Sequence, residues 1–370
     1  MSTTAAQLSG ALLRRPRLDA GLIGALVLLV GIGLVVLYSA SDGSWNAIVR
    51  QLIRVGVGVV ALLVFSQLSP QFLRTWTPLA YAGSVFMLVL VALLGEGRGA
   101  QRWLDLGVIR FQPSELLKLT VPMMLAWYLH RQSIPPRFID LLACLALIAL
   151  PAWLIFKQPD LGTALLVAIS GGGVLFLAGL QWRTIAALGL LAAAASPVLW
   201  YFLHDYQKSR VMMFLNPEAD PLGRGWNIIQ SKIAVGSGGL TGKGWQAGTQ
   251  SHLDFLPESR TDFILAVLAE EFGLIGVLGL LALYLWIIAR CLTLASLGKD
   301  TYGRLLAGSL TLVFFVYVMV NAGMISGLLP VVGVPLPLVS YGGTSVVSLL
   351  AGFGMILSVY SHRKFLKSPR

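Results

Sequence analysis

The sequence predicts an all-α membrane protein with about ten transmembrane helices and one large extramembrane loop. Of its 370 residues, 56% are hydrophobic and only 12% are charged, whereas soluble domains carry about 25% charged residues. The apolar residues also gather in runs of roughly 20, the length that a helix needs to cross the hydrocarbon layer. These observations exclude a soluble globular protein, and residues 1–370 are expected to form a single membrane domain.

Eight strong apolar runs predict transmembrane helices, and two weaker segments that contain charges bring the number to ten. The strong runs are 21–39, 77–94, 141–156, 161–180, 185–203, 272–289, 305–329 and 346–360, and the weaker segments are 48–67 and 115–129. The first run is too long for the apolar region of a cleavable signal peptide, which has about 7–15 residues. It is therefore expected to remain as a helix.

The distribution of basic residues predicts the orientation in the membrane. With the N-terminus inside, the short inner segments hold fourteen Lys and Arg residues and the short outer loops hold six. Cytoplasmic loops are enriched in Lys and Arg, so both termini are expected to be cytoplasmic. The large loop, about residues 204–262, then lies outside. The net charge of +11 is explained as an orientation signal and needs no nucleic-acid partner.

The large loop contains a possible amphipathic stretch at 226–234 and a glycine-rich segment at 236–244. The glycine-rich segment resembles a phosphate-binding loop, but Gly244 follows Lys243 where that motif requires Ser or Thr. No strand is predicted before it. A flexible, turn-rich loop is the favoured interpretation.

Polar residues stand at the start of four predicted helices. These starts are 112–115 (Gln-Pro-Ser-Glu), 158–160 (Gln-Pro-Asp), 261–262 (Thr-Asp) and 338–343 (Leu-Val-Ser-Tyr-Gly-Gly). In the predicted topology all four begin on the outer face. Because helix N-termini favour anions, we expect them to converge on one outward-facing cavity that suits an anion such as pyrophosphate.

Asp262 is the leading candidate for a functional carboxylate, because it closes the polar loop and directly precedes an apolar run. A purely structural interpretation is a helix-start acid, worth about 0.3–1 kcal/mol through the helix dipole. That interpretation does not explain why Asp254, Glu258, Arg260 and Asp262 crowd into nine residues beside a membrane. An acid or base that works on a polar, lipid-anchored substrate remains the alternative.

Other charged residues also have two interpretations. Glu115 and Lys118 lie three residues apart, which suits either an internal ion pair or a substrate-facing pair. Loop cations Arg102 and Arg210 are either solvated or suited to phosphate and sugar recognition. For Glu270 and Glu271, packing against polar backbone or water is favoured. The proline-broken segment 329–337 must be buried in protein or line a cavity.

The ordered series of motifs resembles the SEDS family over nearly the whole chain. The motifs are 102–107 (Arg-Trp-Leu-Asp-Leu-Gly), 112–115, 158–163 (Gln-Pro-Asp-Leu-Gly-Thr), 236–239 with 242–244, 256–258 with 261–263, and 335–337 with 340–343. The short N-terminal tail and residues 103–111 are more similar to the elongation members of this family than to the division members.

The resemblance implies a peptidoglycan glycosyltransferase that polymerises lipid II on the outer face of the bacterial cytoplasmic membrane, for cell elongation and rod shape. It also implies a class B penicillin-binding protein as partner and Asp262 as the catalytic residue, expected to be the general base. A divalent cation, Mg²⁺ or Mn²⁺, is implied by the resemblance only, and no acidic cluster can be assigned as its ligands. The expected substrate-binding residues are Lys118, Glu115, Arg210, Arg102, Asp160 and Ser340.

The chain departs from the family pattern at two positions: Arg260 stands where His is usual, and Asp254 where Glu is frequent. The first departure removes any histidine relay beside Asp262. Two other classes of function remain open. A flippase for the lipid-linked precursor is compatible with ten spans and a proline-broken segment, although no inverted repeat is found. A scaffold that only recruits a synthase would tolerate neutral substitutions at the charged positions.

Overall fold

A computed structural model describes residues 18–94, 104–105, 110–203, 205–220, 225–252 and 258–363. Its helices are α2 (Ala20–Ala40), α3 (Trp45–Gln67), α4 (Pro70–Leu94), α5 (Ser114–Leu129), α6 (Phe138–Lys157), α7 (Leu161–Leu177), α8 (Trp182–Phe202), α9 (Asp205–Leu215), α10 (Trp226–Ser237), α11 (Thr249–His252), α12 (Ile264–Ser296), α13 (Thr301–Ile325) and α14 (Thr344–Ser361). A short 3-10 helix, η1 (Pro217–Ala219), follows α9, and β1 (Leu104–Asp105) pairs antiparallel with β2 (Arg110–Phe111). The all-helical prediction is confirmed apart from this two-residue pairing.

All ten predicted membrane segments are helical, but they differ in length. Seven of the described helices are long and apolar enough to cross a membrane: α2, α3, α4, α6, α12, α13 and α14. Helix α7 and the part of α8 over Trp182–Val198 are apolar but shorter, and α5 has 16 residues. Because a crossing helix needs about 20 residues, the number of ten crossings stays a prediction.

Two helices begin at least seven residues before the apolar runs that predicted them. Helix α4 starts at Pro70, because proline is preorganised for the first helical position. Helix α12 starts at Ile264, and Glu270 and Glu271 are buried inside it. The strong apolar run 272–289 excluded these two acids, since an unpaired charge is expensive in a membrane helix, whereas the polar helix start predicted at 261–262 agrees with the observed start.

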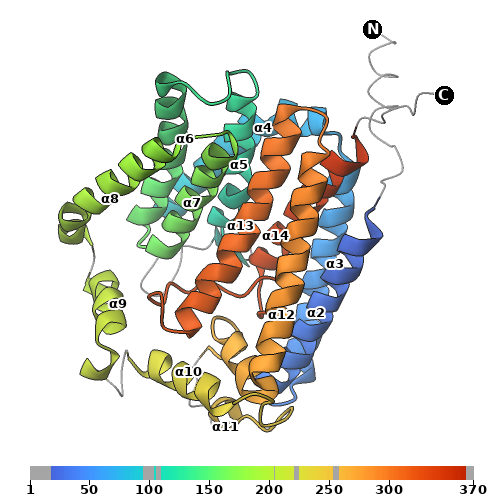
Figure 1. Ribbon diagram of the computed structural model, residues 1–370, viewed down its shortest axis with the longest axis vertical. Coiled ribbons are helices and arrows are strands. Elements are labelled where there is room, and N and C mark those ends of the chain that lie inside the picture. Colours follow the sequence, from blue (N-terminus) through green and yellow to red (C-terminus); the bar gives the residue numbers. More distant parts are fainter. Residues whose placement is uncertain are drawn as a thin grey trace.

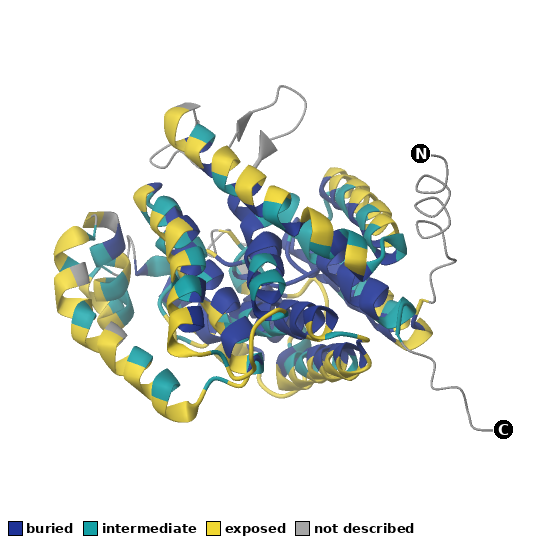
Figure 2. Cartoon of the chain, turned by 90° about the horizontal axis from the view of Figure 1, so that it is seen from above, coloured by how far each residue is buried: buried dark blue, intermediate teal, exposed yellow. Residues whose placement is uncertain are grey.

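Helix α13 lies at the centre of the bundle, where it contacts α5, α7, α12 and α14 (Figure 1). Seen from above, the helices at the rim turn exposed residues outward and buried residues toward the centre (Figure 2). The exposed faces are themselves apolar: Val57 of α3 is 54% exposed and Leu190 of α8 is 73% exposed. Apolar side chains on both the inner and the outer faces are what a helix bundle surrounded by lipid requires.

Helices α9, α10 and α11 lie at one end of the bundle, which is called the loop end here (Figure 1). The predicted amphipathic stretch is α10, and it packs on α12 and α13. Its buried residues are Ile228, Gln230, Ser231 and Ala234. The large loop is therefore largely helical and rests on the bundle.

The glycine segment (residues 236–244) repairs a break in α12. Gly273 has φ +65° and ψ −164°, so the regular hydrogen-bond pattern of α12 stops there. Four backbone bonds of 3.0–3.1 Å cross the break: Lys243 and Gly244 donate to Glu270 and Glu271, and Leu274 and Ile275 donate to Gly239 and Leu240. The predicted turns are present, with positive φ at Gly239, Gly242 and Gly244. The segment is bonded in place rather than flexible, because the broken helix needs its donors and acceptors.

Glu270 fastens the next part of the loop to the same place. Its buried carboxylate accepts hydrogen bonds from Lys243 Nζ at 2.7 Å and from the backbone N–H groups of Thr249 and Gln250 at 2.8 and 3.2 Å. Glu271 accepts a hydrogen bond from the Ser39 hydroxyl on α2. Both acids therefore have a structural role, as the sequence analysis favoured: each carboxylate is buried against polar groups of the protein.

Replacing Gly273 by Ala should destabilise the protein by at least about 2 kcal/mol, because L-residues are strained at positive φ. A Cβ atom at this position would also lie 2.6 Å from the Leu240 backbone. Thermal unfolding in detergent measures the effect. The matched control is Gly279→Ala in the same helix, where nothing lies within 4 Å of the added atom. Equal melting temperatures for the two variants would contradict the role of Gly273.

Candidate active site

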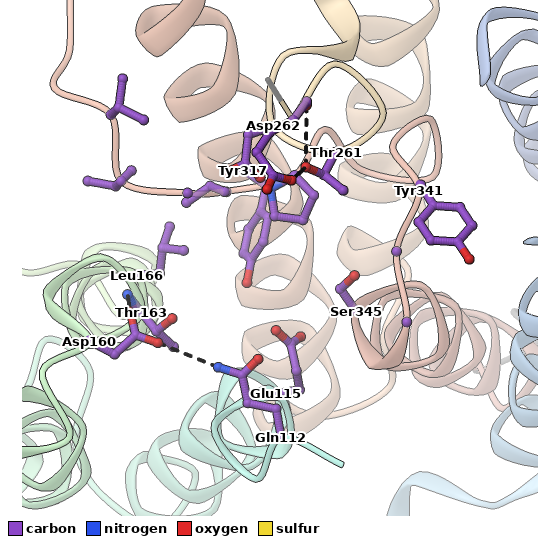
Figure 3. A pocket seen from close by; sticks show the side chains of 18 of the residues that line it. Gln112, Glu115, Asp160, Thr163, Leu166, Thr261, Asp262, Tyr317, Tyr341 and Ser345 are labelled. Carbon is purple, nitrogen blue, oxygen red and sulfur yellow. Dashed lines mark hydrogen bonds between the residues drawn. The ribbon is translucent and has the colours of Figure 1, made fainter. Parts of the chain in front are cut away.

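A cavity of about 600 Å³ lies where the starts of α5, α7 and α14 meet the residues that precede α12 (Figure 3). The convergence predicted for the four polar helix starts is therefore confirmed. Helices α9, α10 and α13 and the proline-broken segment complete the wall. The lining includes Gln112, Glu115, Lys118, Asp160, Thr163, Arg210, Asn227, Glu258, Thr261, Asp262, Tyr317, residues 331–335 and residues 341–345.

The backbone at Asp262 is held by the C-terminal part of the chain. The three carbonyl groups of residues 260–262 accept hydrogen bonds from Tyr341 N–H at 2.9 Å, from Ser340 Oγ at 2.5 Å and from Asn321 Nδ2 at 2.9 Å, respectively. Asn321 Nδ2 also donates to the carbonyl of Val334 at 2.7 Å. Asp262 therefore enters the cavity from a backbone that is fixed on three consecutive peptide groups.

Burial, the largest cause, raises the pKa of the Asp262 carboxyl from 3.8 to about 6. The negative charge of Glu258 raises the same pKa, and the positive charge of Arg210 lowers it. Asp262 Oδ2 lies beside Gly333, where a Cβ atom would be 3.5 Å away. A carboxylate with a pKa near 6 is ionised at neutral pH yet binds a proton more readily than a solvated aspartate, which suits a general base.

Glu115 and Lys118 fit both of their interpretations. Lys118 Nζ donates to Glu115 Oε1 at 2.6 Å, and Ser348 Oγ on α14 donates to Glu115 Oε2 at 3.1 Å. Both charged residues are buried and both line the cavity. The ammonium group of Lys118 also lies 4.7 Å from the centre of the Tyr317 ring. The pair is internally neutralised and at the same time faces the space that a substrate would occupy.

Asp160 joins the starts of two helices at the cavity wall. Its Oδ1 accepts a hydrogen bond from the N–H of Thr163 at 3.2 Å, which caps α7. Its Oδ2 accepts one from Gln112 Nε2, before α5, at 3.5 Å (Figure 3). Capping explains why the sequence places an acid here, and the cavity position keeps the substrate-binding hypothesis open.

The remaining predicted site residues have different positions. Arg210 of α9 lines the cavity and is exposed. Ser340 is 1% exposed and lies behind the wall, where its hydroxyl also accepts a hydrogen bond from the N–H of Leu336 at 2.7 Å. Its predicted contact with substrate is untested, and its contacts in the structure hold the backbone. Arg102 and Asp254 lie outside the described residues.

Arg260, which stands where the family usually has His, points away from Asp262. Its Nε donates to the carbonyl of Ala40 at 3.2 Å, and its guanidinium lies 3.8 Å from the carboxylate of Asp42. Both partners lie at the end of α2. The arginine therefore connects the segment before α12 to α2. The charges that act on the Asp262 carboxylate are those of Glu258 and Arg210.

Two residues of α13 at this site were missed by sequence analysis. Tyr317 lines the cavity, and Asn321, one turn further along, bonds the carbonyl of Asp262. The signal was available: a tyrosine and an asparagine four residues apart share one face of a helix, and a polar amide inside an apolar run is costly unless it is bonded. Both lay in the predicted span 305–329 and were counted only as parts of it.

Among the residues that the structure describes, no group of three or more His, Cys, Asp or Glu side chains could hold a metal ion. Within the cavity, Asp262 and Glu258 line the same wall and interact electrostatically. Mg²⁺ is often bound by one or two carboxylates together with the phosphates of a substrate. The cavity therefore offers carboxylate oxygens to a cation that arrives with a phosphorylated substrate, and its described residues do not form a closed protein-only site.

Comparison with known proteins assigns the chain to a family. The model of the FtsW, RodA and SpoVE family, described as cell cycle proteins, matches residues 20–365. The chain is 52% identical over 351 residues to the peptidoglycan glycosyltransferase MrdB of Escherichia coli K12, covering 94% of this chain and 95% of that protein. It is 37% identical over 368 residues to the probable peptidoglycan glycosyltransferase FtsW of Trichlorobacter lovleyi, covering 94% and 95%. The chain belongs to this family, as its resemblance to the SEDS proteins predicted.

Solved structures agree with this assignment. One match is a chain from a structure of a peptidoglycan synthase complex that coordinates polymerization and crosslinking. It superimposes with a TM-score of 0.82 at 36% identity, covering 94% of this chain and 99% of that one. The rod shape determining protein RodA of Thermus thermophilus superimposes with a TM-score of 0.72 at 32% identity, covering 94% and 98%. These likenesses and the identity to MrdB agree with the predicted similarity to elongation members.

Replacing Asn321 by Leu should destabilise the protein by about 1–3 kcal/mol, because two buried carbonyl groups lose their donor. The melting temperature in detergent measures this change. The matched control is Ser309→Ala on the same helix, whose buried hydroxyl donates only to the carbonyl of Leu306 in the preceding turn. A loss in the Asn321 variant no larger than in this control would contradict the bridging role.

Proposed function

We propose that this protein is a peptidoglycan glycosyltransferase that polymerises lipid II into glycan strands for cell elongation and rod shape. One observation carries the proposal: four helix starts that are far apart in the sequence meet at one polar cavity, with Asp262 in its wall. The relatives named as peptidoglycan glycosyltransferases supply the reaction. A polar cavity inside a membrane helix bundle also suits this substrate, because its sugar and pyrophosphate are polar while its anchor is a lipid.

Asp262 is the general base of this proposal. A hydroxyl oxygen of the acceptor sugar attacks the anomeric carbon of the donor sugar, and the bond from that carbon to the pyrophosphate oxygen breaks. The hydroxyl proton passes to the Asp262 carboxylate, and the lipid pyrophosphate leaves. A sugar hydroxyl does not ionise at neutral pH, so a positioned base is worth about 10²–10⁴-fold in rate. The fixed backbone of residues 260–262 supports this role, because it fixes the point from which the carboxylate enters the cavity.

The charges of the cavity support a divalent cation as a further participant. Its described lining holds four carboxylates, Glu115, Asp160, Glu258 and Asp262, and two basic groups, Lys118 and Arg210. A pyrophosphate would enter a lining that is already acidic on balance. The pyrophosphate oxygens would supply most ligands of the cation, which would neutralise the charge that develops on the leaving pyrophosphate. Mg²⁺ and Mn²⁺ both suit oxygen ligands of this kind.

The proposed setting is the bacterial cytoplasmic membrane, with both termini in the cytoplasm and the loop end in the periplasm. The excess of Lys and Arg in the predicted inner loops supports this orientation. The proposed partner is a class B penicillin-binding protein, a transpeptidase. The likeness to a chain of a peptidoglycan synthase complex that combines polymerization with crosslinking supports a partner of this kind.

Asp262→Asn should reduce polymerisation by at least about 10²-fold, because the amide cannot accept the proton. The melting temperature should be unchanged or higher, since the burial that raises the pKa of this carboxyl penalises its charged form in the folded state. Purified protein is incubated with lipid II, with and without a class B partner, and the glycans are resolved on a gel. Asp205→Asn, an exposed acid of the same loop, is the control.

Near-normal turnover in the Asp262 variant would remove the general-base role. If wild-type protein makes no polymer with any partner or cation, but moves lipid II across proteoliposome membranes, the glycosyltransferase proposal fails and the flippase hypothesis replaces it.

The rate of polymerisation should fall on acidification through about pH 6, where Asp262 takes up a proton. Glu258→Gln removes the neighbouring charge that raises this pKa, so the acidic limb of the kcat/KM profile should move to lower pH. Glu218→Gln makes the same charge change at an exposed position of the loop and should leave the limb in place. A limb that is insensitive to Glu258 would assign the titration to another group.

A further inference from the structure

Tyr317 lines the cavity, and the proposed base chemistry does not use its buried hydroxyl group, which lies beside Lys118. Tyr317 is 2% exposed, and its hydroxyl has no hydrogen-bond acceptor among the described residues. In Figure 3 the side chain extends from α13 with its hydroxyl end directed toward the level of Glu115 and Asp160, with which it interacts electrostatically. A buried phenol without an acceptor lowers stability, so a bound ligand is the natural source of the missing partner.

The surroundings of this hydroxyl favour an acceptor-only ligand. The carboxylate of Glu115 already accepts hydrogen bonds from Lys118 and Ser348. The carboxylate of Asp160 already accepts hydrogen bonds from Thr163 and Gln112. Both carboxylates are thus already engaged by donors, and the Tyr317 hydroxyl is a donor at the cavity wall that has no acceptor among the described residues. Phosphate oxygens accept hydrogen bonds and donate none, whereas sugar hydroxyl groups do both.

Lys118 strengthens the donor character of Tyr317. Its ammonium group lies 4.7 Å from the centre of the phenol ring, within the range of a cation–π interaction. A positive charge at this position polarises the ring, and it acts across a low-dielectric interior in which hydrogen bonds polarise one another. The starts of α5, α7 and α14 at the same cavity add the positive ends of three helix dipoles.

We propose that the Tyr317 hydroxyl donates a hydrogen bond to a pyrophosphate oxygen of the lipid-linked substrate. The proposal rests on the glycosyltransferase function and assigns Tyr317 to the leaving group, on the opposite part of the reaction from Asp262. The bond is strongest when the bond between the sugar and the pyrophosphate breaks, because negative charge then collects on the pyrophosphate. Tyr317 is thus assigned as a catalytic residue that stabilises the departing group.

Tyr317→Phe tests the proposal because it removes only the oxygen and keeps the ring beside Lys118. The kcat/KM for lipid II should fall roughly 10- to 100-fold, while the melting temperature stays the same or rises, since an unpaired buried group is removed. The matched control is Tyr302→Phe on the same helix. Tyr302 is 0% exposed, lies outside the cavity lining and shares a hydrogen bond of 3.0 Å with Thr77, so its loss should lower the melting temperature and leave kcat/KM unchanged.

A second measurement identifies the group that Tyr317 contacts. A polyprenyl pyrophosphate without a sugar is added as an inhibitor of lipid II polymerisation. Its inhibition constant should rise several-fold in the Tyr317 variant and remain unchanged in the Tyr302 variant. A fall in kcat/KM without any change in this constant would move the contact to the sugar and overturn the proposal. Failure of this compound to inhibit wild-type protein would overturn it as well.

The two proposals fail in different ways. If the Tyr317 variant polymerises lipid II at the wild-type rate, the assignment of Tyr317 is wrong and the glycosyltransferase function stands. If wild-type protein itself does not polymerise lipid II under any partner and cation condition, the function fails first.

Discussion

Backbone polar groups inside a hydrocarbon layer must find partners within the protein, because lipid offers none. Three irregular stretches of this chain enter the bundle under that constraint: the residues before α12, the proline-broken segment and the loop that leads into α14. They satisfy one another. The carbonyl groups of residues 260–262 are bonded by Asn321, Ser340 and Tyr341, and Asn321 also bonds the proline-broken segment. The cavity exists because these stretches replace regular helix at one level of the bundle.

The same constraint shapes the electrostatics. Charged groups at this depth are expensive unless they are paired or hydrated, and the described cavity wall contains both kinds. Glu115 and Lys118 neutralise each other, and Asp160 is held by two donors. Asp262 instead keeps a carboxylate whose pKa is raised by burial to about 6. Pairing lowers the free energy of burying the charges of Glu115, Lys118 and Asp160. The free energy of burying a charge therefore falls mainly on Asp262, the residue proposed to act as the base.

The sequence predicted the helices and the convergence of their polar starts, because both follow from local pattern and from alternation across the membrane. The candidate residues Asp262, Glu115, Lys118, Asp160 and Arg210 all line one cavity in the structure, and their roles stay predictions. It did not reveal that Ser340 faces backbone, since a serine beside a cavity and a serine behind its wall look alike in a pattern. Tyr317 and Asn321 were missed because apolar neighbours masked them. The glycine segment was misjudged as flexible, because its partners across Gly273 are about 30 residues away in the chain.

The bonding across Gly273 has a mechanical meaning. The glycine segment and α12 share four backbone hydrogen bonds, and the Glu270 carboxylate binds the residues that follow. Helix α10, which ends inside the glycine segment, is therefore coupled to α12 and is more than a tethered surface element. A displacement of α10 would therefore act on the part of α12 between Ile264 and Gly273, which begins two residues after Asp262. The large loop is thus mechanically coupled to the segment that follows Asp262, so a protein that binds the loop would act on the position of that carboxylate.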